Sequence, residues 1–239
     1  RVSMKLLNHF GVKKPLISYH EHNHVTAGQS VLNRLLAGES CALMTDAGTP
    51  AISDPGEDLV RLCAENGVEV RAIPGCCAAV NALAVSGLPT GRFTFEGFLT
   101  VNKKSRREHL NSLKGETRTM IFHEAPHKLR TTLNDLTEAF GPDRRISLCR
   151  ELTKLHEEVL RFTLAEAVAY YEENAPKGEY VLVVAGAAPK TGAVVTLEDS
   201  VAQVLALKEQ GMRLKDAAKE VAEHTGLSKN ELYAAALER

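Results

Sequence analysis

The segment Thr45-Asp46-Ala47-Gly48-Thr49-Pro50-Ala51-Ile52-Ser53-Asp54-Pro55-Gly56 lies between a short apolar run and a helical pattern. Two glycines, two prolines and two aspartates within twelve residues indicate a rigid turn whose backbone can approach a ligand closely. In open α/β sheets, ligands bind outside the carboxyl ends of the strands. The segment is therefore predicted to be a ligand-binding turn between a strand and a helix. Composition alone leaves open a tight turn with an Asp cap.

A second turn of the same kind follows at Ile73-Pro74-Gly75-Cys76-Cys77-Ala78-Ala79, where another apolar run passes through Pro-Gly into a helical pattern. Two such turns at the ends of successive strands are predicted to form one pocket rim.

The segments around these turns alternate between strand and helix patterns, which predicts a mostly parallel sheet in an N-terminal α/β domain, residues 1–89. Before the breaker-rich junction 87–91, strands are expected at 16–22, 41–45 and 68–73, and helices at 26–37, 57–66 and 76–86.

A second α/β domain, residues 90–188, is predicted to contain a mixed sheet, because the connection between strands 145–150 and 157–162 is too short for a parallel crossover. Its other strands are expected at 93–99, 118–122 and 179–185, and its helices at 105–113, 126–140 and 164–173. A linker, 186–196, and a helical tail, 196–239, with helices at 197–210, 213–224 and 228–238, complete the chain.

Composition narrows the class of protein. The 239 residues are 44% hydrophobic and 25% charged, with no apolar run long enough to span a bilayer and no signal peptide. Five cysteines in apolar stretches, without metal-type spacing, indicate reduced core thiols and a cytoplasmic protein. The net charge of −1 means that any nucleic acid must be bound by a local basic patch.

Several motifs, in the order that the family keeps, resemble the tetrapyrrole-methylase superfamily. Asp-Ala-Gly-Thr-Pro (46–50), Ser-Asp-Pro-Gly (53–56) and Pro-Gly-x-Cys-Ala (74–78) resemble the superfamily as a whole. Other stretches resemble its branch of ribosomal RNA small-subunit 2′-O-methyltransferases: Ser18–Asn23, Phe95–Leu99, Phe122–His127, Arg150–Lys154 and Lys177–Val181. The resemblance implies a two-domain class III methyltransferase.

The start of the chain departs from the family pattern. Family members open with a strand and a Gly-Thr-Pro-Ile-Gly-Asn-type turn, whereas this sequence begins at about the Arg that follows them. We expect the N-terminal domain to lack that strand and turn, either because the sequence is cropped or because they are absent.

The resemblance implies S-adenosylmethionine as cofactor, in the cleft between the two α/β domains. Carried over residue by residue, its contacts would be Asp46, Ala47, Gly48, Thr49, Pro50, Ser53, Pro74, Gly75, Cys77, Phe122, Glu124, Arg150, Glu151, Leu152, Thr153, Gly178, Glu179 and Tyr180.

Methyl transfer to an alcohol is an in-line displacement that needs positioning and removal of the hydroxyl proton. Glu124, His127 and Glu179, with Lys128, are the candidate bases, and the sequence leaves the choice open. No covalent nucleophile is needed, so the cysteines need no catalytic role.

Two histidine patterns raise the question of a metal site. His123-Glu124-Ala125-Pro126-His127 matches H-E-x-x-H, but a strand pattern before it and Pro126 within it oppose the single helical turn that a zinc protease needs. His20, His22 and His24 alternate on one predicted strand, which favours histidines facing solvent or substrate over a metal site. No metal is predicted.

Residues 101–118 hold six basic residues against two acidic ones. A solvated helix face and an RNA-binding loop are the two interpretations, and the resemblance favours RNA. The predicted RNA contacts are Lys103, Lys104, Arg106, Arg107, Lys128 and Lys177. The helix-turn-helix pattern at 214–237 lies in a tail with six Lys/Arg and eight Asp/Glu, which favours a packing module over a nucleic-acid reader.

The leading hypothesis is a methyltransferase acting on the ribose 2′-hydroxyl of a cytidine in 16S ribosomal RNA or the small ribosomal subunit. Methylation of a tetrapyrrole and non-catalytic nucleic-acid binding are the alternatives. The resemblance also implies a homodimer.

Overall fold

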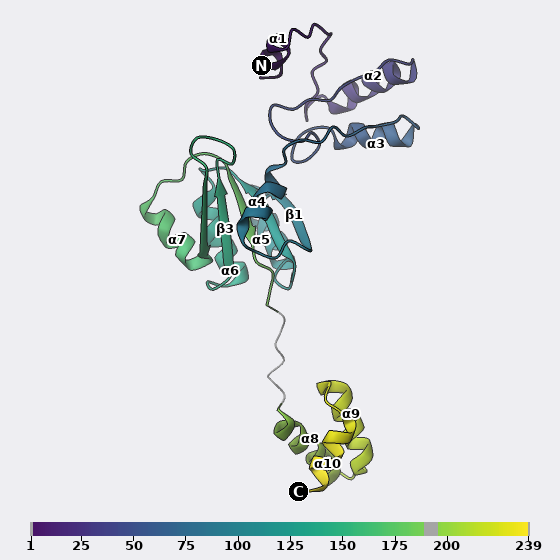
Figure 1. The fold of residues 1–239 in the computed structure, drawn as a ribbon, viewed down its shortest axis with the longest axis vertical. Helices are drawn as coiled ribbons and strands as arrows, with labels where there is room; N and C mark the ends of the chain where they lie inside the picture. The colour runs from purple at the N-terminus through teal and green to yellow at the C-terminus, as the bar shows by residue number, and fades with distance from the viewer. Residues whose placement is uncertain (1, 189–195, 239) are drawn as a thin grey trace. The chain divides into compact units, whose positions relative to one another are not determined.

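The computed structural model describes residues 2–188 and 196–238. The chain forms two compact units, Arg1–Ala187 and Ala188–Arg239, which are described separately (Figure 1). The predicted linker 186–196 falls largely on 189–195, outside the described residues.

The first unit contains a five-stranded mixed sheet with the order β1-β2-β5-β3-β4. Its strands are β1 (Phe93–Phe98), β2 (Thr119–Glu124), β3 (Arg145–Arg150), β4 (Glu158–Thr163) and β5 (Tyr180–Val184). β1 and β2 pair in parallel, whereas the other neighbours are antiparallel. The mixed sheet predicted from the short β3–β4 connection is confirmed.

The two faces of the sheet carry different layers because strand side chains alternate. Met120 and Phe122 of β2 lie in the larger core, which is shared with α5 (Lys103–Ser112), α6 (Leu129–Phe140) and α7 (Leu164–Glu173). Ile121 lies on the opposite face, where α4 (Ala78–Ser86) packs through small side chains (Figure 1).

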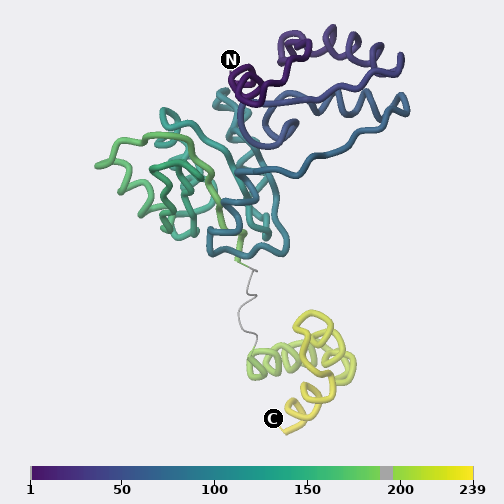
Figure 2. The backbone as a smooth tube through the Cα atoms, turned by 45° about the horizontal axis from the view of Figure 1, so that its top comes forward, coloured from purple at the N-terminus to yellow at the C-terminus, as the bar shows by residue number. Residues whose placement is uncertain are grey.

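The N-terminal part of this unit contains α1 (Val2–His9), α2 (His24–Leu36) and α3 (Glu57–Glu65). Helices α2 and α3 run side by side over a small apolar core that includes Val31 and Cys63 (Figure 2). Tyr19 donates a 2.6 Å hydrogen bond to Asp58, which also pairs with the His24 ring. These contacts tie residues 19–24 to the first turn of α3.

The strands predicted at 16–22, 41–45 and 68–73 are wrong, and with them the parallel sheet of the N-terminal domain within the described residues. Each segment runs without a ladder partner, and Ile73 is 86% exposed. Apolar alternation predicts which side chains could share a face, but a strand also needs a neighbouring backbone to bond its N–H and C=O groups.

The second unit consists of α8 (Leu197–Glu209), α9 (Leu214–Thr225) and α10 (Lys229–Leu237), packed around Val204, Val221 and Leu232. The three predicted tail helices are confirmed. Over the residues that the structure describes in both units, no helix combines the length and apolarity needed to cross a membrane.

Candidate functional site

The two proline-glycine turns predicted to form one rim lie against each other. The Thr49 hydroxyl donates a 2.9 Å hydrogen bond to the backbone carbonyl of Cys76. Gly48 lies beside the same carbonyl, since an added Cβ would be in ordinary van der Waals contact with it, at 3.6 Å. The turns at 45–56 and 73–77 therefore form one joined structure.

Left-handed backbone is concentrated in the predicted cofactor loops. Among the described residues, the non-glycine positions with positive φ are Ala51, Ser53, Glu151 and Thr153, with φ between 51° and 68°. Such conformations are costly for residues with a Cβ and cluster at ligand-binding sites. All four lie in the loops 45–56 and 150–154.

The first loop also has backbone donors that are not used within the fold. The backbone amides of residues 46–49 donate no hydrogen bond within the part of the chain that the structure describes. An exposed turn with unused amide donors suits a ligand that carries a carboxylate and hydroxyl groups.

A second loop pair forms where β3 ends and β5 begins, at the Arg150–Tyr180 register. A Glu151 carboxylate oxygen accepts hydrogen bonds from the Glu179 amide, at 2.9 Å, and from Lys154 Nζ, at 2.8 Å. Lys154 also reaches the Glu179 carboxylate at 2.9 Å. These bonds, the Lys154 bond first, lower the pKa of Glu151, so that it stays ionised and holds the two loops together.

Gly178 lies directly against this carboxylate at φ +77°. A Cβ at this position would overlap the Glu151 side chain. The predicted residues Glu151, Gly178 and Glu179 are thus brought together.

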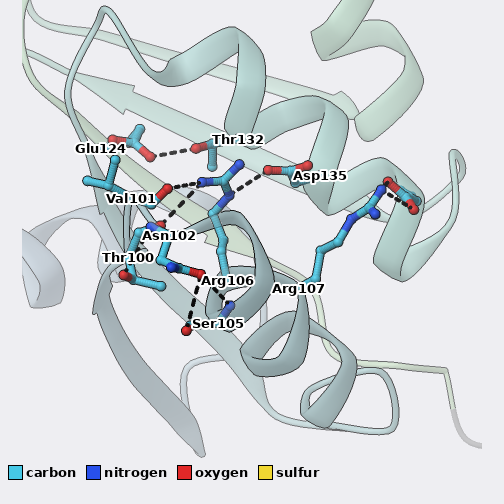
Figure 3. A network of polar contacts seen from close by, with 10 residues as sticks. Thr100, Val101, Asn102, Ser105, Arg106, Arg107, Glu124, Thr132 and Asp135 are labelled. Carbon is cyan, nitrogen blue, oxygen red and sulfur yellow. Dashed lines mark hydrogen bonds and ion pairs between the residues drawn. The ribbon is translucent and has the colours of Figure 1, made fainter.

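Two other predicted cofactor contacts lie on the wrong face of the sheet. Phe122 is fully buried in the larger core. Glu124 is 3% exposed, and its carboxylate accepts hydrogen bonds from the Ala125 amide at 2.8 Å and the Thr132 hydroxyl at 2.6 Å (Figure 3). The Thr132 bond fastens the end of β2 to α6, and the Ala125 bond holds the carboxylate against the turn that follows β2. We leave Phe122 and Glu124 out of the proposed site for this reason.

His123, between them, faces the other way and was not selected from the sequence. Its ring lies edge-on to Phe95 and Phe98, and its Nε2 is buried without a hydrogen-bond partner. Burial lowers the pKa of His123, against the opposing charges of Asp54 and Glu179. His123 pairs with Val181 in the β2–β5 ladder, so it lies beside the loop 178–180. The alternation of side chains along a strand is the signal that could have identified it, since His123 stands between two residues that face the larger core.

The predicted RNA contacts divide into arginines bonded to carboxylates of α6 and lysines that are more accessible. Arg106 is largely buried and donates to Asp135 at 2.6 Å and to the carbonyls of Thr100 and Val101 (Figure 3). Arg107 pairs with Glu138 at 2.8 Å. Arg106 stabilises the α5–α6 packing and is corrected from an RNA contact to a structural residue, because its guanidinium is used inside the fold.

The remaining predicted basic residues are more accessible. Lys103 and Lys104 are exposed at the start of α5, and Lys177 is exposed at the mouth of a groove of about 250 Å³ lined by Arg150 and Tyr180. Lys128 is half-buried beside the exposed His127, in the turn before α6. These four lysines stay candidates for phosphate binding.

The cysteines are only partly as predicted. Cys63 and Cys149 are buried, but Cys41 and Cys76 are exposed in loops and are not core residues. Across the described ranges, no group of three His, Cys, Asp or Glu side chains is arranged to hold a metal ion.

Comparison with known protein families identifies the family of this chain. The family described as Tetrapyrrole (Corrin/Porphyrin) Methylases matches residues 4–168, and the domain described as the RsmI C-terminal HTH domain matches residues 195–239. The chain belongs to the tetrapyrrole methylase family.

Curated relatives resemble the chain over nearly its whole length. A protein from Synechocystis sp. named Ribosomal RNA small subunit methyltransferase I is 46% identical over 98% of this chain and 84% of the relative. Proteins with the same name from Halalkalibacterium halodurans and Escherichia coli O157:H7 are 45% and 42% identical, each over 98% of this chain, and over 81% and 82% of their own lengths. The predicted membership of this branch is confirmed.

Solved structures share the fold. The methyltransferase CobJ has a TM-score of 0.54 at 21% identity, covering 76% of this chain and 78% of its own. Diphthine synthase has a TM-score of 0.55 at 13% identity, covering 77% and 73%. At these identities the comparison shows the α/β fold alone.

Proposed function

We propose that this chain transfers a methyl group from S-adenosylmethionine to the ribose 2′-hydroxyl of a cytidine in 16S ribosomal RNA. The observation that carries the proposal is the likeness, over 98% of the chain, to proteins named Ribosomal RNA small subunit methyltransferase I. The likeness includes the tail, which matches its own domain family.

The joined turns at 45–56 and 73–77 are proposed to hold the cofactor. The free amides of 46–49 suit the carboxylate of its methionine end, and Pro50, Ser53, Pro74, Gly75 and Cys77 complete this side. The loops at 150–153 and 178–180 are proposed to enclose its adenine. When bound, S-adenosylmethionine supplies a methyl group on a positively charged sulfur.

The chain must then orient the hydroxyl and accept its proton. We propose Glu179 for this role, because its side chain is 83% exposed while its backbone is fastened to Glu151. His127, also exposed, is the second candidate. Lys103, Lys104, Lys128 and Lys177 are proposed to bind RNA phosphates.

We also propose that the protein acts in the cytoplasm as a homodimer. Exposed large apolar side chains are numerous at the N-terminal end and offer a surface for a second copy: Val2, Met4, Leu6, Phe10, Val12, Leu16 and Ile17. Sedimentation at micromolar concentration tests this directly, and a purely monomeric protein would contradict it.

The test of the function uses S-adenosylmethionine with a labelled methyl group and three acceptors: purified small ribosomal subunits, naked 16S RNA and a uroporphyrinogen. We expect label in RNA, at a cytidine whose 3′ linkage resists alkali because its 2′-oxygen is blocked. Label only in the tetrapyrrole would overturn the proposal.

Variants refine this assay. Glu179→Gln should lower kcat about 10²- to 10⁴-fold if Glu179 is the base. Glu173→Gln, an exposed carboxylate at the end of α7, is the matched control and should leave the rate unchanged. A normal rate for Glu179→Gln with a slow His127→Asn would transfer the role to His127.

A further inference from the structure

Strand β1 carries exposed aromatic side chains along a free edge of the sheet. β1 is an edge strand, paired only with β2. Its residues Phe93, Phe95 and Phe98 are 41%, 38% and 57% exposed. Large apolar side chains exposed together on one strand indicate a binding surface.

A bulge keeps these rings on one face. Phe95 lies opposite Ile121, but Gly97, not Glu96, lies opposite Phe122, and Phe98 lies opposite His123. Without the extra residue, Phe98 would point to the opposite face. Gly97 has φ +64°, which a residue with a side chain adopts only with strain.

The rings gather around one imidazole. Phe95 and Phe98 contact His123 edge-on, with ring centroids 5.2 and 5.4 Å away. Such edge contacts leave ring faces free for stacking. Since His123 pairs with Val181 across the β2–β5 ladder, two residues after Glu179, this cluster lies beside the loop 178–180 that is proposed to enclose the cofactor.

The charged residues that flank the row in sequence are basic. Arg92 precedes Phe93, and Lys103 and Lys104 follow Phe98 within six residues, all exposed. Glu96 points away and pairs with His109 at 2.9 Å. Exposed aromatic rings with basic side chains nearby are typical of surfaces that bind single-stranded nucleic acid.

The same charges disfavour a second copy of the chain on this edge. In a two-fold symmetric contact the patch faces itself, so the basic groups at the ends of β1 would oppose basic groups of the partner.

We propose that Phe95 and Phe98, held around His123, form a stacking shelf for a single-stranded base of the RNA substrate next to the methyl-transfer site. This proposal rests on the RNA substrate proposed above and adds the residues that position it. The shelf recognises an unpaired base by its π face, whatever its sequence.

The test is binding of a twelve-nucleotide single-stranded RNA with one central 2-aminopurine, whose fluorescence falls when it stacks on an aromatic ring. Phe98→Leu keeps the apolar side chain and removes the π face. Loss of a stacked base weakens binding about 5- to 150-fold. We expect Phe98→Leu to show this loss with no quenching, and Phe98→Tyr to bind and quench as the unmodified chain does.

Tyr233→Leu is the matched control, because Tyr233 is an aromatic residue, 37% exposed, on α10 of the tail and outside every proposed site. It should bind RNA normally. Equal RNA affinity of Phe98→Leu and the unmodified chain overturns the shelf. A change in sedimentation instead of RNA affinity also overturns it and assigns the row to subunit contact.

Methylation of small ribosomal subunits, measured on the same proteins, separates this proposal from the proposed function. If the unmodified chain methylates RNA and Phe98→Leu does so equally well, only the shelf fails. If the unmodified chain binds RNA through the shelf but methylates none, only the proposed reaction fails.

Discussion

The hydroxyl of Thr49 and the backbone carbonyl of Cys76, 27 residues apart in sequence, are joined by a 2.9 Å hydrogen bond. This bond links the two turns proposed to hold the methionine end of the cofactor. Neither turn contains a helix or strand of its own. Their relative position therefore depends on a small number of side-chain contacts.

Replacing Thr49 by Val should consequently weaken S-adenosylmethionine binding. One hydrogen bond contributes about 0.5 to 1.5 kcal/mol, which corresponds to a two- to twelvefold higher Kd in calorimetry. Thr49→Ser keeps the hydroxyl and should restore most of the affinity. Equal affinities of Thr49→Val and Thr49→Ser for S-adenosylmethionine would show that this hydrogen bond does not hold the site in its binding geometry.

Gly178→Ala should disrupt the second loop pair. The new methyl group would overlap the Glu151 carboxylate, and alanine at φ +77° is itself strained. We expect a loss of about 1 to 3 kcal/mol in the free energy of unfolding by urea, together with weaker cofactor binding. Gly91→Ala, at an open position, is the control and should change neither quantity. A fully stable Gly178→Ala protein would contradict the close packing of Glu151 on Gly178.

The parts of the fold that depend on local features of the sequence were predicted correctly. The mixed sheet followed from the length of one connection, and the tail helices followed from periodicity, with Gly226 ending α9 at φ +73°. The strands at 16–22, 41–45 and 68–73 failed because pairing depends on a partner elsewhere in the chain.

The site was predicted at the level of loops and less well at the level of side chains. Proline and glycine identified both turns, since they fix backbone geometry locally. Motif matching then chose Phe122 and Glu124, whereas the register of β2 turns His123 toward the loops. Arg106 was predicted as an RNA contact from the number of basic residues in 101–118. That number does not show that Arg106 Nε lies 2.6 Å from a carboxylate oxygen of Asp135.

Arg106 and Arg107 should therefore respond differently to mutation. Arg106 and Asp135 are 12% and 11% exposed, and removing one partner of a buried ion pair costs about 3 to 5 kcal/mol. Arg107 and Glu138 are about half exposed or more, and such a pair contributes about 1 kcal/mol or less. In urea unfolding, we expect Arg106→Ala to lower the free energy of unfolding by about 3 to 5 kcal/mol. Arg107→Ala should lower it by about 1 kcal/mol or less. Similar small losses for both, with weaker RNA binding by Arg106→Ala, would return Arg106 to the RNA surface.

His123 should make stability depend on pH. Burial lowers the pKa of His123 below its ordinary value of 6.5, so the unfolded chain binds a proton more readily than the folded chain does. Its contribution to stability is thus fully present above about pH 6.5 and is lost as pH falls through the lower pKa of the folded state. Asp54 and Glu179 oppose this shift, whereas Phe95 and Phe98 are uncharged.

The comparison between the unmodified chain and His123→Phe isolates this contribution. Phe cannot titrate, so the difference in unfolding free energy between the two proteins should shift in favour of the variant as pH falls below 6.5. Ile121→Val, on the same strand β2, is the control: it removes one methylene from the core at a cost of about 0.5 to 1.5 kcal/mol, equal at every pH. A His123→Phe difference as constant with pH as that of Ile121→Val would mean that the pKa of His123 is the same in the folded and unfolded chain, and would contradict the lowering of that pKa by burial.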